Sequence, residues 1–374
     1  MKTLLKNLTI IDHNLKEYTG HIVIENGKII ETGKVDENSL KNDTELKIYD
    51  LEGCYASPGF IDMHVHLREP GREDKETVLS GCNAAANGGF TAVACMPNTD
   101  PTIDSAEIVE SIIHKSKNHL VDVYPIAAAT IERKGEFLSP IAELVEAGAV
   151  AFSDDGVAIK TAAVLRRVME YASMFNVPVI EHCEDESMAG GSMNEGYFST
   201  IYGVSTLPPV AEDITVSRDI LMSEFTGAKL HIAHISTKRS IELVREAKTR
   251  GVRVTAEVTP HHFTLTDEAL KNYDTNLKMN PPLRTATDVE EVLKGLSDGT
   301  IDVIATDHAP HTIEEKEMEF EYAPNGILGL ETCIGLSINN LVHKGILTLS
   351  QLVEKLAINP RKVLNLEIPK IEPG

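Results

Sequence analysis

The chain has 374 residues, a length that allows one large folded core with a smaller unit and excludes a short binding peptide. Hydrophobic residues make up 42% and charged residues 25%, which is typical of a globular protein and excludes extended disorder. The 57 Asp and Glu outnumber the 35 Lys and Arg and give a formal net charge of -22, so the surface as a whole repels nucleic-acid phosphates and anionic lipid.

Cysteine usage and hydropathy indicate the cellular compartment. The chain has five widely spaced cysteines and no Cys-x-x-Cys pair, which favours a reducing cytoplasm over a secreted disulfide framework. No apolar run approaches the roughly 18 residues of a membrane span, and no signal peptide is evident. We therefore expect a cytoplasmic protein without nucleic-acid or membrane partners. An anionic small molecule would need a dedicated cation in its site.

The first part of the chain predicts a small β domain. Residues 1–56 contain four short strand-like segments separated by turn residues, and Asn26-Gly27 is typical of a two-residue hairpin turn. The segments span residues 4–11, 22–25, 28–31 and 46–51.

From residue 57 onward, short apolar runs alternate with amphipathic helical stretches. The eight runs span residues 60–66, 91–96, 121–128, 149–153, 177–182, 229–235, 253–258 and 301–306. Helical patterns between them include residues 161–175, part of 205–226, 238–250 and 288–296. Eight β segments each followed by a helix predict an α/β fold, a (β/α)8 TIM-type barrel over residues 57–358. An open doubly wound sheet is the alternative, but the chain has neither a Gly-x-Gly-x-x-Gly after the first run nor a Walker-type phosphate loop.

Reactive side chains recur where these runs end, which is the edge at which barrel enzymes carry their active sites. The set comprises His64, His66, Asp154, Asp155, His182, His234 and Asp307. His64 and His66 are two positions apart, so on a strand both imidazoles point to the same face. Taken singly, each residue has an ordinary explanation as a core histidine or a turn aspartate.

The joint position of these side chains favours a metal centre. Four histidines and two carboxylates at five strand ends would converge on one point above the barrel. Imidazole and carboxylate suit Zn²⁺ or a similar divalent ion, and six ligands exceed what one tetrahedral ion takes. We therefore predict two metal ions bridged by a carboxylate.

Five segments of the chain carry a family resemblance. They are residues 58–71 (PGFIDMHVHLREPG), 96–99 (MPNT), 182–185 (HCED), 279–284 (MNPPLR) and 306–311 (TDHAPH). Together they resemble the class I dihydroorotases of the amidohydrolase superfamily. The resemblance implies a barrel enzyme with two Zn²⁺ per chain. Such an enzyme reversibly cyclises N-carbamoyl-L-aspartate to L-dihydroorotate in de novo pyrimidine (UMP) biosynthesis.

The resemblance also implies roles for single residues. It makes His64, His66 and Asp307 ligands of the first metal, and His182 and His234 ligands of the second. The bridging carboxylate would be Asp155, the second aspartate of Asp-Asp-Gly, with Asp154 as the alternative. Asp307 would also be the catalytic acid and base.

Substrate-binding positions follow from the same resemblance. Arg68, Asn98, Asn280 and His311 match family residues that bind substrate, and Asn325-Gly326 matches a loop that offers backbone contacts. Arg68 also continues the even-numbered alternation of His64 and His66. Its guanidinium can bind a carboxylate through two parallel hydrogen bonds, which would supply the cation that an anionic substrate needs. His261 and His262 are assigned a structural or supporting role.

Two other functions remain as alternatives. One is a different cyclic amidase, an allantoinase or a dihydropyrimidinase, but Arg68 and the aspartate bridge argue against it, because related hydantoinases and allantoinases carry a carboxylated lysine at the bridge. The other is a noncatalytic homologue that serves as a structural partner in a pyrimidine-pathway assembly. Such a protein would be expected to have lost ligands, whereas all six are present. A serine hydrolase is disfavoured because no Gly-x-Ser-x-Gly occurs.

The resemblance bears on domain organisation and partners too. Family members continue with further β strands beyond the point that corresponds to residue 374, so we expect the C-terminal part of the small β domain to be missing. Residues 359–374 would then return toward that domain. The expected partner is the small-molecule substrate, and a homodimer or an association with another enzyme of the pathway stays open.

Overall fold

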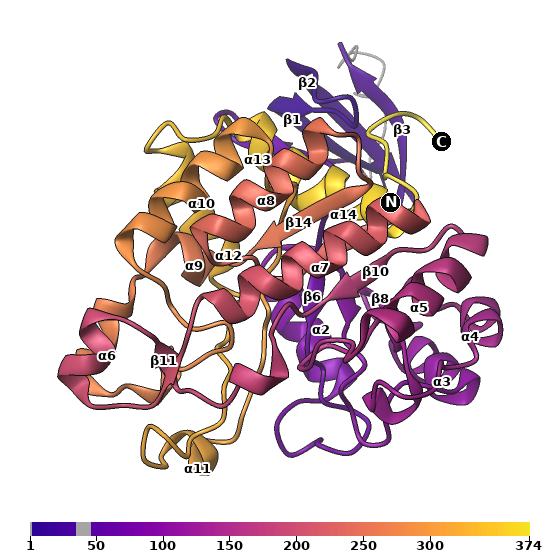
Figure 1. Ribbon diagram of the computed structural model, residues 1–374. Helices are drawn as coiled ribbons and strands as arrows, with labels where there is room; N and C mark the ends of the chain where they lie inside the picture. The colour runs from indigo at the N-terminus through magenta and orange to yellow at the C-terminus, as the bar shows by residue number, and fades with distance from the viewer. Residues whose placement is uncertain (1, 35–45) are drawn as a thin grey trace.

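A computed structural model describes residues 2–34 and 46–374. Figure 1 shows a small N-terminal sheet at one end of a barrel, and the loops that carry helices α6 (Tyr197–Tyr202) and α11 (Ile313–Lys316) at the other end. Among the described residues, no helix combines the length and apolar character that a membrane crossing requires.

The N-terminal sheet has five strands in the order β3-β2-β1-β4, with β5 also paired to β1. They are β1 (Lys2–Ile11), β2 (Glu17–Glu25), β3 (Lys28–Gly33), β4 (Lys47–Asp50) and β5 (Tyr55–Ala56). The expected hairpin turn is confirmed, because Asn26 and Gly27 both have positive φ, 50° and 79°, as this turn requires. The expected domain boundary at residue 56 stays a prediction, and residues 35–45 lie outside the described part of the chain.

The predicted barrel is confirmed. Eight parallel strands follow one another in the order β15-β14-β13-β10-β9-β8-β7-β6. They are β6 (Phe60–Val65), β7 (Phe90–Cys95), β8 (Asp122–Ala128), β9 (Ala151–Ser153), β10 (Val179–Glu181), β13 (Leu230–Ile232), β14 (Val254–Val258) and β15 (Val303–Ile304). A parallel bridge between Val65 and His308 joins the first strand to the segment after the last, which nearly closes the cylinder.

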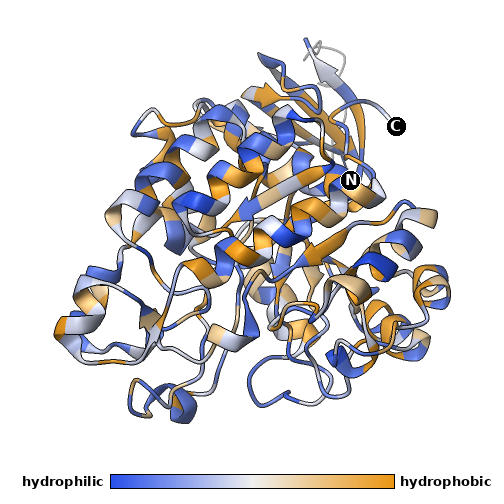
Figure 2. Ribbon diagram, viewed as in Figure 1, coloured by the Kyte–Doolittle hydropathy of each residue, from blue (hydrophilic) through white to orange (hydrophobic). Residues whose placement is uncertain are grey.

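Helices between the strands form the outer layer. The main ones are α2 (Val78–Asn87), α3 (Ala106–Ser116), α4 (Ile141–Ala147), α5 (Ala162–Met174), α7 (Val210–Thr226), α8 (Lys238–Thr249) and α10 (Ala286–Asp298). Several begin at a threonine whose side-chain oxygen accepts a backbone N–H of the first turn, as Thr161, Thr237 and Thr285 do for α5, α8 and α10. In Figure 2, polar and apolar residues alternate along α8 and α10, as expected of helices with one buried face.

Shorter elements lie in the loops and at the end of the chain. Those in the loops are η1 (Ile131–Arg133), η2 (Glu186–Met188), β11 (Met193–Asn194), α6, β12 (Thr206–Leu207), α9 (Pro260–Thr264), η3 (Asp267–Asn272), η4 (Thr275–Leu277) and α11. After the barrel come α12 (Cys333–Ser337), η5 (Ile338–Val342), α13 (Leu349–Val353), η6 (Glu354–Ile358) and α14 (Asn359–Leu364). Beyond α14, Ile371 packs against Leu8, Ile10 and Ile22 of the N-terminal sheet. The expected boundary at residue 358 stays a prediction.

The barrel strands divide their side chains between two clusters. Residues such as Val93, Val179 and Ile232 pack against the helices in the larger cluster. Alternate residues such as Ala94, Ile126 and Ile180 form a second cluster, to which α14 contributes Val363 and Leu364. An apolar cluster therefore fills part of the barrel interior at the end near α14. The carboxyl ends of the strands lie at the opposite end of the barrel, where polar side chains gather.

Candidate metal centre

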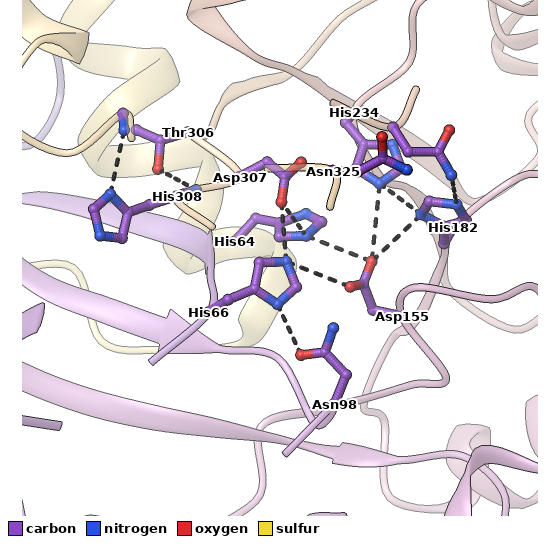
Figure 3. A network of polar contacts seen from close by, with 12 residues as sticks. His64, His66, Asn98, Asp155, His182, His234, Thr306, Asp307, His308 and Asn325 are labelled. Atoms are coloured by element: carbon purple, nitrogen blue, oxygen red, sulfur yellow. Dashed lines mark hydrogen bonds and ion pairs between the residues drawn. The ribbon is translucent and has the colours of Figure 1, made fainter. Parts of the chain in front are cut away.

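The six predicted metal ligands lie together at the carboxyl ends of five barrel strands. His64 belongs to β6, and the others follow strand ends within three residues: His66 after β6, Asp155 after β9, His182 after β10, His234 after β13 and Asp307 after β15. All six are buried, none more than 7% exposed. Figure 3 shows their side chains turned toward one another.

A register irregularity in β6 affects the direction of the His64 and His66 side chains. The pairing of β6 with β7 shifts between Asp62 and Val65. Ile61, which lies before the shift, packs in the inner cluster, and Val65, which lies after it, packs in the outer one. His64 and His66 therefore both point into the barrel, as their two-residue spacing predicts.

Asp155 is the carboxylate that faces all four histidines. Its Oδ1 lies 3.5 Å from Nε2 of His64, 3.7 Å from Nδ1 of His182 and 3.8 Å from Nε2 of His234. Its Oδ2 lies 3.5 Å from Nε2 of His66. One carboxylate thus spans both histidine pairs, which is the geometry expected of a bridging ligand.

Asp154, the alternative bridge, takes part in a different interaction. Its carboxylate accepts hydrogen bonds from the backbone N–H of Thr130 at 2.9 Å and from the Thr130 hydroxyl at 2.5 Å. These contacts hold the loop after β8 and occupy the side chain. The geometry favours Asp155 over Asp154 as the bridge.

Asp307 completes the group on the side of β6. Its Oδ1 lies 2.9 Å from Nε2 of His66 and 3.5 Å from Nε2 of His64. Donor atoms of His64, His66 and Asp307 form one set that could hold a metal ion, and donor atoms of His64, Asp155 and His234 form another. Nδ1 of His182 lies 2.9 Å from Nε2 of His234.

Three residues of the site have a backbone conformation that L-amino acids adopt rarely. The φ angles are +31° at His234, +50° at Asp307 and +61° at Arg68. Such residues cost on the order of 1–3 kcal/mol each unless their surroundings impose the conformation. Each follows a strand end, so the sharp turn of the backbone directs the side chain toward the barrel axis.

The electrostatics of the site favour a positive charge among these atoms. Burial lowers the pKa of His64, but the carboxylates of Glu257, Asp155 and Asp307 outweigh burial and raise this pKa to about 10. Burial raises the pKa of Asp155, but His64, His182 and His234 hold it well below its usual value. A proton and a metal ion are both positive charges, so the surroundings that stabilise one at Nε2 of His64 also stabilise the other.

The donor atoms fit a metal ion for a second reason. Nε2 of His64 and Oδ1 of Asp155 are buried, face each other and have no hydrogen-bond partner. Buried polar atoms without partners are costly, and such atoms in a native fold call for an explanation. Imidazole nitrogen and carboxylate oxygen are the donors that Zn²⁺ and similar ions bind, so a divalent ion between the two explains both atoms.

A cavity of about 180 Å³ opens in front of this group. It is lined by every predicted site residue except His64: His66, Arg68, Asn98, Asp155, His182, His234, Asn280, Asp307, His311, Asn325 and Gly326. His64 lies behind the others and is fully buried. The structure thus brings the predicted ligands and the predicted substrate-binding residues to one place.

Individual contacts orient the lining residues. Nε of Arg68 donates to the carbonyl of Pro310 at 3.1 Å, and Asn98 Oδ1 lies 2.8 Å from Nδ1 of His66. His311 lies between Glu315, 2.9 Å from its Nδ1, and the carbonyl of Asn325, 2.8 Å from its Nε2. Burial lowers the pKa of His311 to about 4 despite Glu315.

One reason given for Arg68 was wrong. Strand β6 ends at Val65, so Arg68 lies beyond the strand and its direction does not come from the alternation of His64 and His66. The residue lines the cavity because its loop adopts a positive φ.

The buried groups behind the proposed ligands were not predicted from the sequence. Oε1 of Glu257 on β14 lies 2.5 Å from Nδ1 of His64, and Oδ1 of Asp62 accepts the backbone N–H groups of His64 and Thr306 at 3.2 and 3.1 Å. The apolar run 253–258 carried a signal for Glu257, because polar Thr255 and Glu257 alternate with Val254, Ala256 and Val258. A strand buried on both faces with such alternation must turn its polar face into the barrel.

His261 and His262 take no place among the ligands. His262 lies 2.8 Å from the Thr259 hydroxyl and 3.1 Å from the carbonyl of Pro281, next to Asn280. Burial lowers the pKa of His262 to about 4. These contacts agree with the supporting role expected for His262.

Comparisons with known proteins agree with the site. A family model described as Dihydro-orotase-like matches residues 54–240. The dihydroorotase of Pelotomaculum thermopropionicum is 51% identical over 376 residues, which covers 100% of this chain and 87% of the relative. The dihydroorotase of Acetivibrio thermocellus is 52% identical over 358 residues, covering 94% of this chain and 82% of the relative.

Solved structures share the fold. The L-hydantoinase (dihydropyrimidinase) from Arthrobacter aurescens superposes with a TM-score of 0.85 at 24% identity, covering 100% of this chain and 84% of its own. The dihydropyrimidinase from Brevibacillus agri NCHU1002 gives a TM-score of 0.81 at 21% identity, with 100% and 84% covered. At this identity the likeness concerns the fold.

Proposed function

Because the chain belongs to the dihydroorotase family, we propose that its metal centre catalyses the reversible cyclisation of N-carbamoyl-L-aspartate to L-dihydroorotate, a step of pyrimidine biosynthesis. The chain is a cyclic amide hydrolase of this family. The observation that carries the site assignment is the position of the Asp155 carboxylate between two histidine pairs at the barrel's carboxyl end.

Two zinc ions per chain are the proposed cofactors. His64, His66 and Asp307 would hold one, His182 and His234 the other, and Asp155 would bridge them. Ions of this kind lower the pKa of bound water to about 7 and polarise carbonyl oxygens, so they supply a nucleophile at neutral pH.

The chain's own residues would bind the substrate and move its proton. Arg68 would pair with the substrate carboxylate, and Asn98, Asn280, His311 and the Asn325-Gly326 loop would orient the ring in the cavity. In hydrolysis, the Asp307 carboxylate takes a proton from the attacking water and delivers it to the ring nitrogen as the carbon–nitrogen bond breaks. In cyclisation, the protonated Asp307 acts in the opposite direction.

Metal content measured together with turnover tests this proposal. We expect close to two zinc ions per chain by elemental analysis, and hydrolysis of L-dihydroorotate that a chelator abolishes and added Zn²⁺ restores. A noncatalytic scaffold would contain close to no zinc and show no turnover with or without it. Either result would refute the assignment.

A substrate panel separates the proposed reaction from that of another cyclic amidase. Allantoin, dihydrouracil and hydantoin lack the ring carboxylate that Arg68 would bind. We therefore expect turnover of L-dihydroorotate and little of the other three. Preference for dihydrouracil would favour the dihydropyrimidinase alternative.

The cysteines bear on the compartment in which the protein works. Among the described residues all five cysteines are free, four of them buried, and we propose a cytoplasmic location on this ground. The partner is the small-molecule substrate, without nucleic acid or membrane. A homodimer or an association with another pyrimidine-pathway enzyme remains part of the proposal, which size measurement in solution would test.

A further inference from the structure

A chain of polar side chains runs from His64 into the barrel interior. Nδ1 of His64 lies 2.5 Å from Oε1 of Glu257, and Oε2 of Glu257 lies 3.1 Å from Nε2 of His231 on β13. Nδ1 of His231 lies 2.8 Å from the hydroxyl of Thr255 on β14. His64, Glu257 and His231 have no solvent exposure, so the hydrogen bonds that join them are shielded from water.

The hydrogen positions in this row of polar side chains follow from which atoms can donate and which can accept a hydrogen bond. An ionised Glu257 only accepts, so His64 donates from Nδ1 and His231 donates from Nε2. The Thr255 hydroxyl reaches two acceptors, Nδ1 of His231 at 2.8 Å and the carbonyl of Leu230 at 3.4 Å, and the shorter contact directs its hydrogen toward His231. In this arrangement Nδ1 of His64 is turned to Glu257, and Nε2 is the ring nitrogen that faces Asp155 and Asp307 and is available to a metal ion.

Glu257 also contacts the second half of the site. Its Oε1 accepts the backbone N–H of His234 at 3.3 Å. His234 has the strained φ of +31°, and this hydrogen bond is one of the contacts that hold its backbone. One carboxylate oxygen therefore joins the ring of His64 to the backbone of His234, two residues that serve different metal ions in the proposed site.

We propose that Glu257, His231 and Thr255 are positioning residues that set the tautomer of His64 and hold the two halves of the metal centre at a constant separation. This inference rests on the ligand roles proposed above for His64 and His234. Removing a group that orients a ligating histidine in this way typically weakens metal binding by about 10- to 100-fold.

Metal affinity is the readout that distinguishes positioning from a structural role. Purified wild-type and variant proteins are dialysed against graded chelator, zinc retained per chain is measured by elemental analysis, and the melting temperature of each metal-free protein is recorded. Glu257→Gln keeps the size of the side chain but presents one amide donor to a ring that needs an acceptor. We expect it to weaken zinc binding at least about tenfold.

Two variants of Thr255 form a matched pair at the end of this hydrogen-bonded row that lies farthest from His64. Thr255→Val keeps the shape and removes the hydroxyl donor, whereas Thr255→Ser keeps the hydroxyl and removes a methyl group. Positioning through His231 predicts weaker zinc retention for Thr255→Val, by a smaller factor than for Glu257→Gln, and wild-type retention for Thr255→Ser. A packing role predicts that both substitutions act alike.

Several outcomes would overturn the inference. Wild-type zinc affinity in both Glu257→Gln and Thr255→Val would do so, as would a lower melting temperature of the metal-free variants without loss of affinity. If Glu257→Gln fails to fold, the comparison of Thr255→Val with Thr255→Ser decides. A wild-type protein that binds no zinc would refute the proposed function itself, which is a different result from normal affinity in the variants.

Discussion

At the scale of single residues, the site depends on carboxylates placed among histidines. Burial by itself raises the pKa of Asp307, but the hydrogen bond from His66 and the nearby His64 lower this pKa to about 2. The carboxylate is therefore ionised at neutral pH, in the state that accepts a proton during hydrolysis. The same position suits Asp307 to bind a metal ion, so its two proposed roles, proton carrier and metal ligand, are separated only by measuring both turnover and zinc content.

Substitution Asp307→Asn tests the proton carrier. The amide keeps the size of the side chain but cannot accept and return a proton, so we expect kcat to fall by at least about 100-fold. Dihydroorotate hydrolysis is measured beside zinc content. Retention of near wild-type kcat would exclude Asp307 as the acid and base, whatever its effect on zinc.

Substitution Arg68→Met tests the substrate cation. Loss of a charged hydrogen-bond partner costs about 2–5 kcal/mol when the pair is buried, so we expect a KM for L-dihydroorotate at least tenfold higher. Arg166→Met on the exposed outer face of α5 is the control and should leave KM unchanged. Equal KM values for the two variants would remove Arg68 from the site.

At the scale of elements, strands aim the functional groups and the helices that follow keep the strands in place. Helix α5 begins directly after the loop that carries Asp155, and its first turn is held by the Thr161 side chain, which accepts the backbone N–H of Val164 at 3.2 Å. The stability of such a helix start affects the loop before it.

Substitution Thr161→Ala tests this helix start. Loss of a threonine N-cap costs typically about 1 kcal/mol, so we expect a lower urea midpoint in equilibrium unfolding followed by circular dichroism. Thr161→Ser retains the oxygen and serves as the control, with a midpoint near that of the wild type. An unchanged midpoint for the alanine variant would mean that the cap contributes nothing measurable.

At the scale of the whole molecule, an acidic protein handles an anionic substrate. The net charge of -22 disfavours approach of an anion, whereas Arg68, which lines the cavity, supplies a local positive charge. Ring closure also changes the charge of the substrate, because N-carbamoyl-L-aspartate carries two carboxylates and L-dihydroorotate one.

This charge difference predicts the direction of the pH dependence. Closure consumes one proton, and it needs Asp307 in the protonated form, so lower pH favours closure. Between pH 6 and 9 we expect the rate of closure to fall and that of hydrolysis to rise, measured with saturating substrate in each direction. The opposite trend would contradict the proton path through Asp307.

Much of this molecule was predictable from its sequence, for identifiable reasons. Each apolar run from residue 60 to 306 overlaps a barrel strand, and all but the second run contain their strand whole, because local alternation and chain punctuation set where strands form. The small elements β11, α6 and β12 after the fifth strand were not predicted, because two-residue strands and a six-residue helix are too short to show a periodic pattern. Asp155 and Asp154 were distinguished only by a motif, since neighbouring residues have nearly equal local properties.

What the sequence by itself determined was the order of the elements and the kind of side chain at each strand end, since both depend on neighbours along the chain. Only the tertiary structure decided that Asp155 faces the histidines while Asp154 bonds Thr130, and that Glu257 lies behind His64, 193 positions away. Those distances depend on how eight strands close into a cylinder, a property of packing that no local pattern contains.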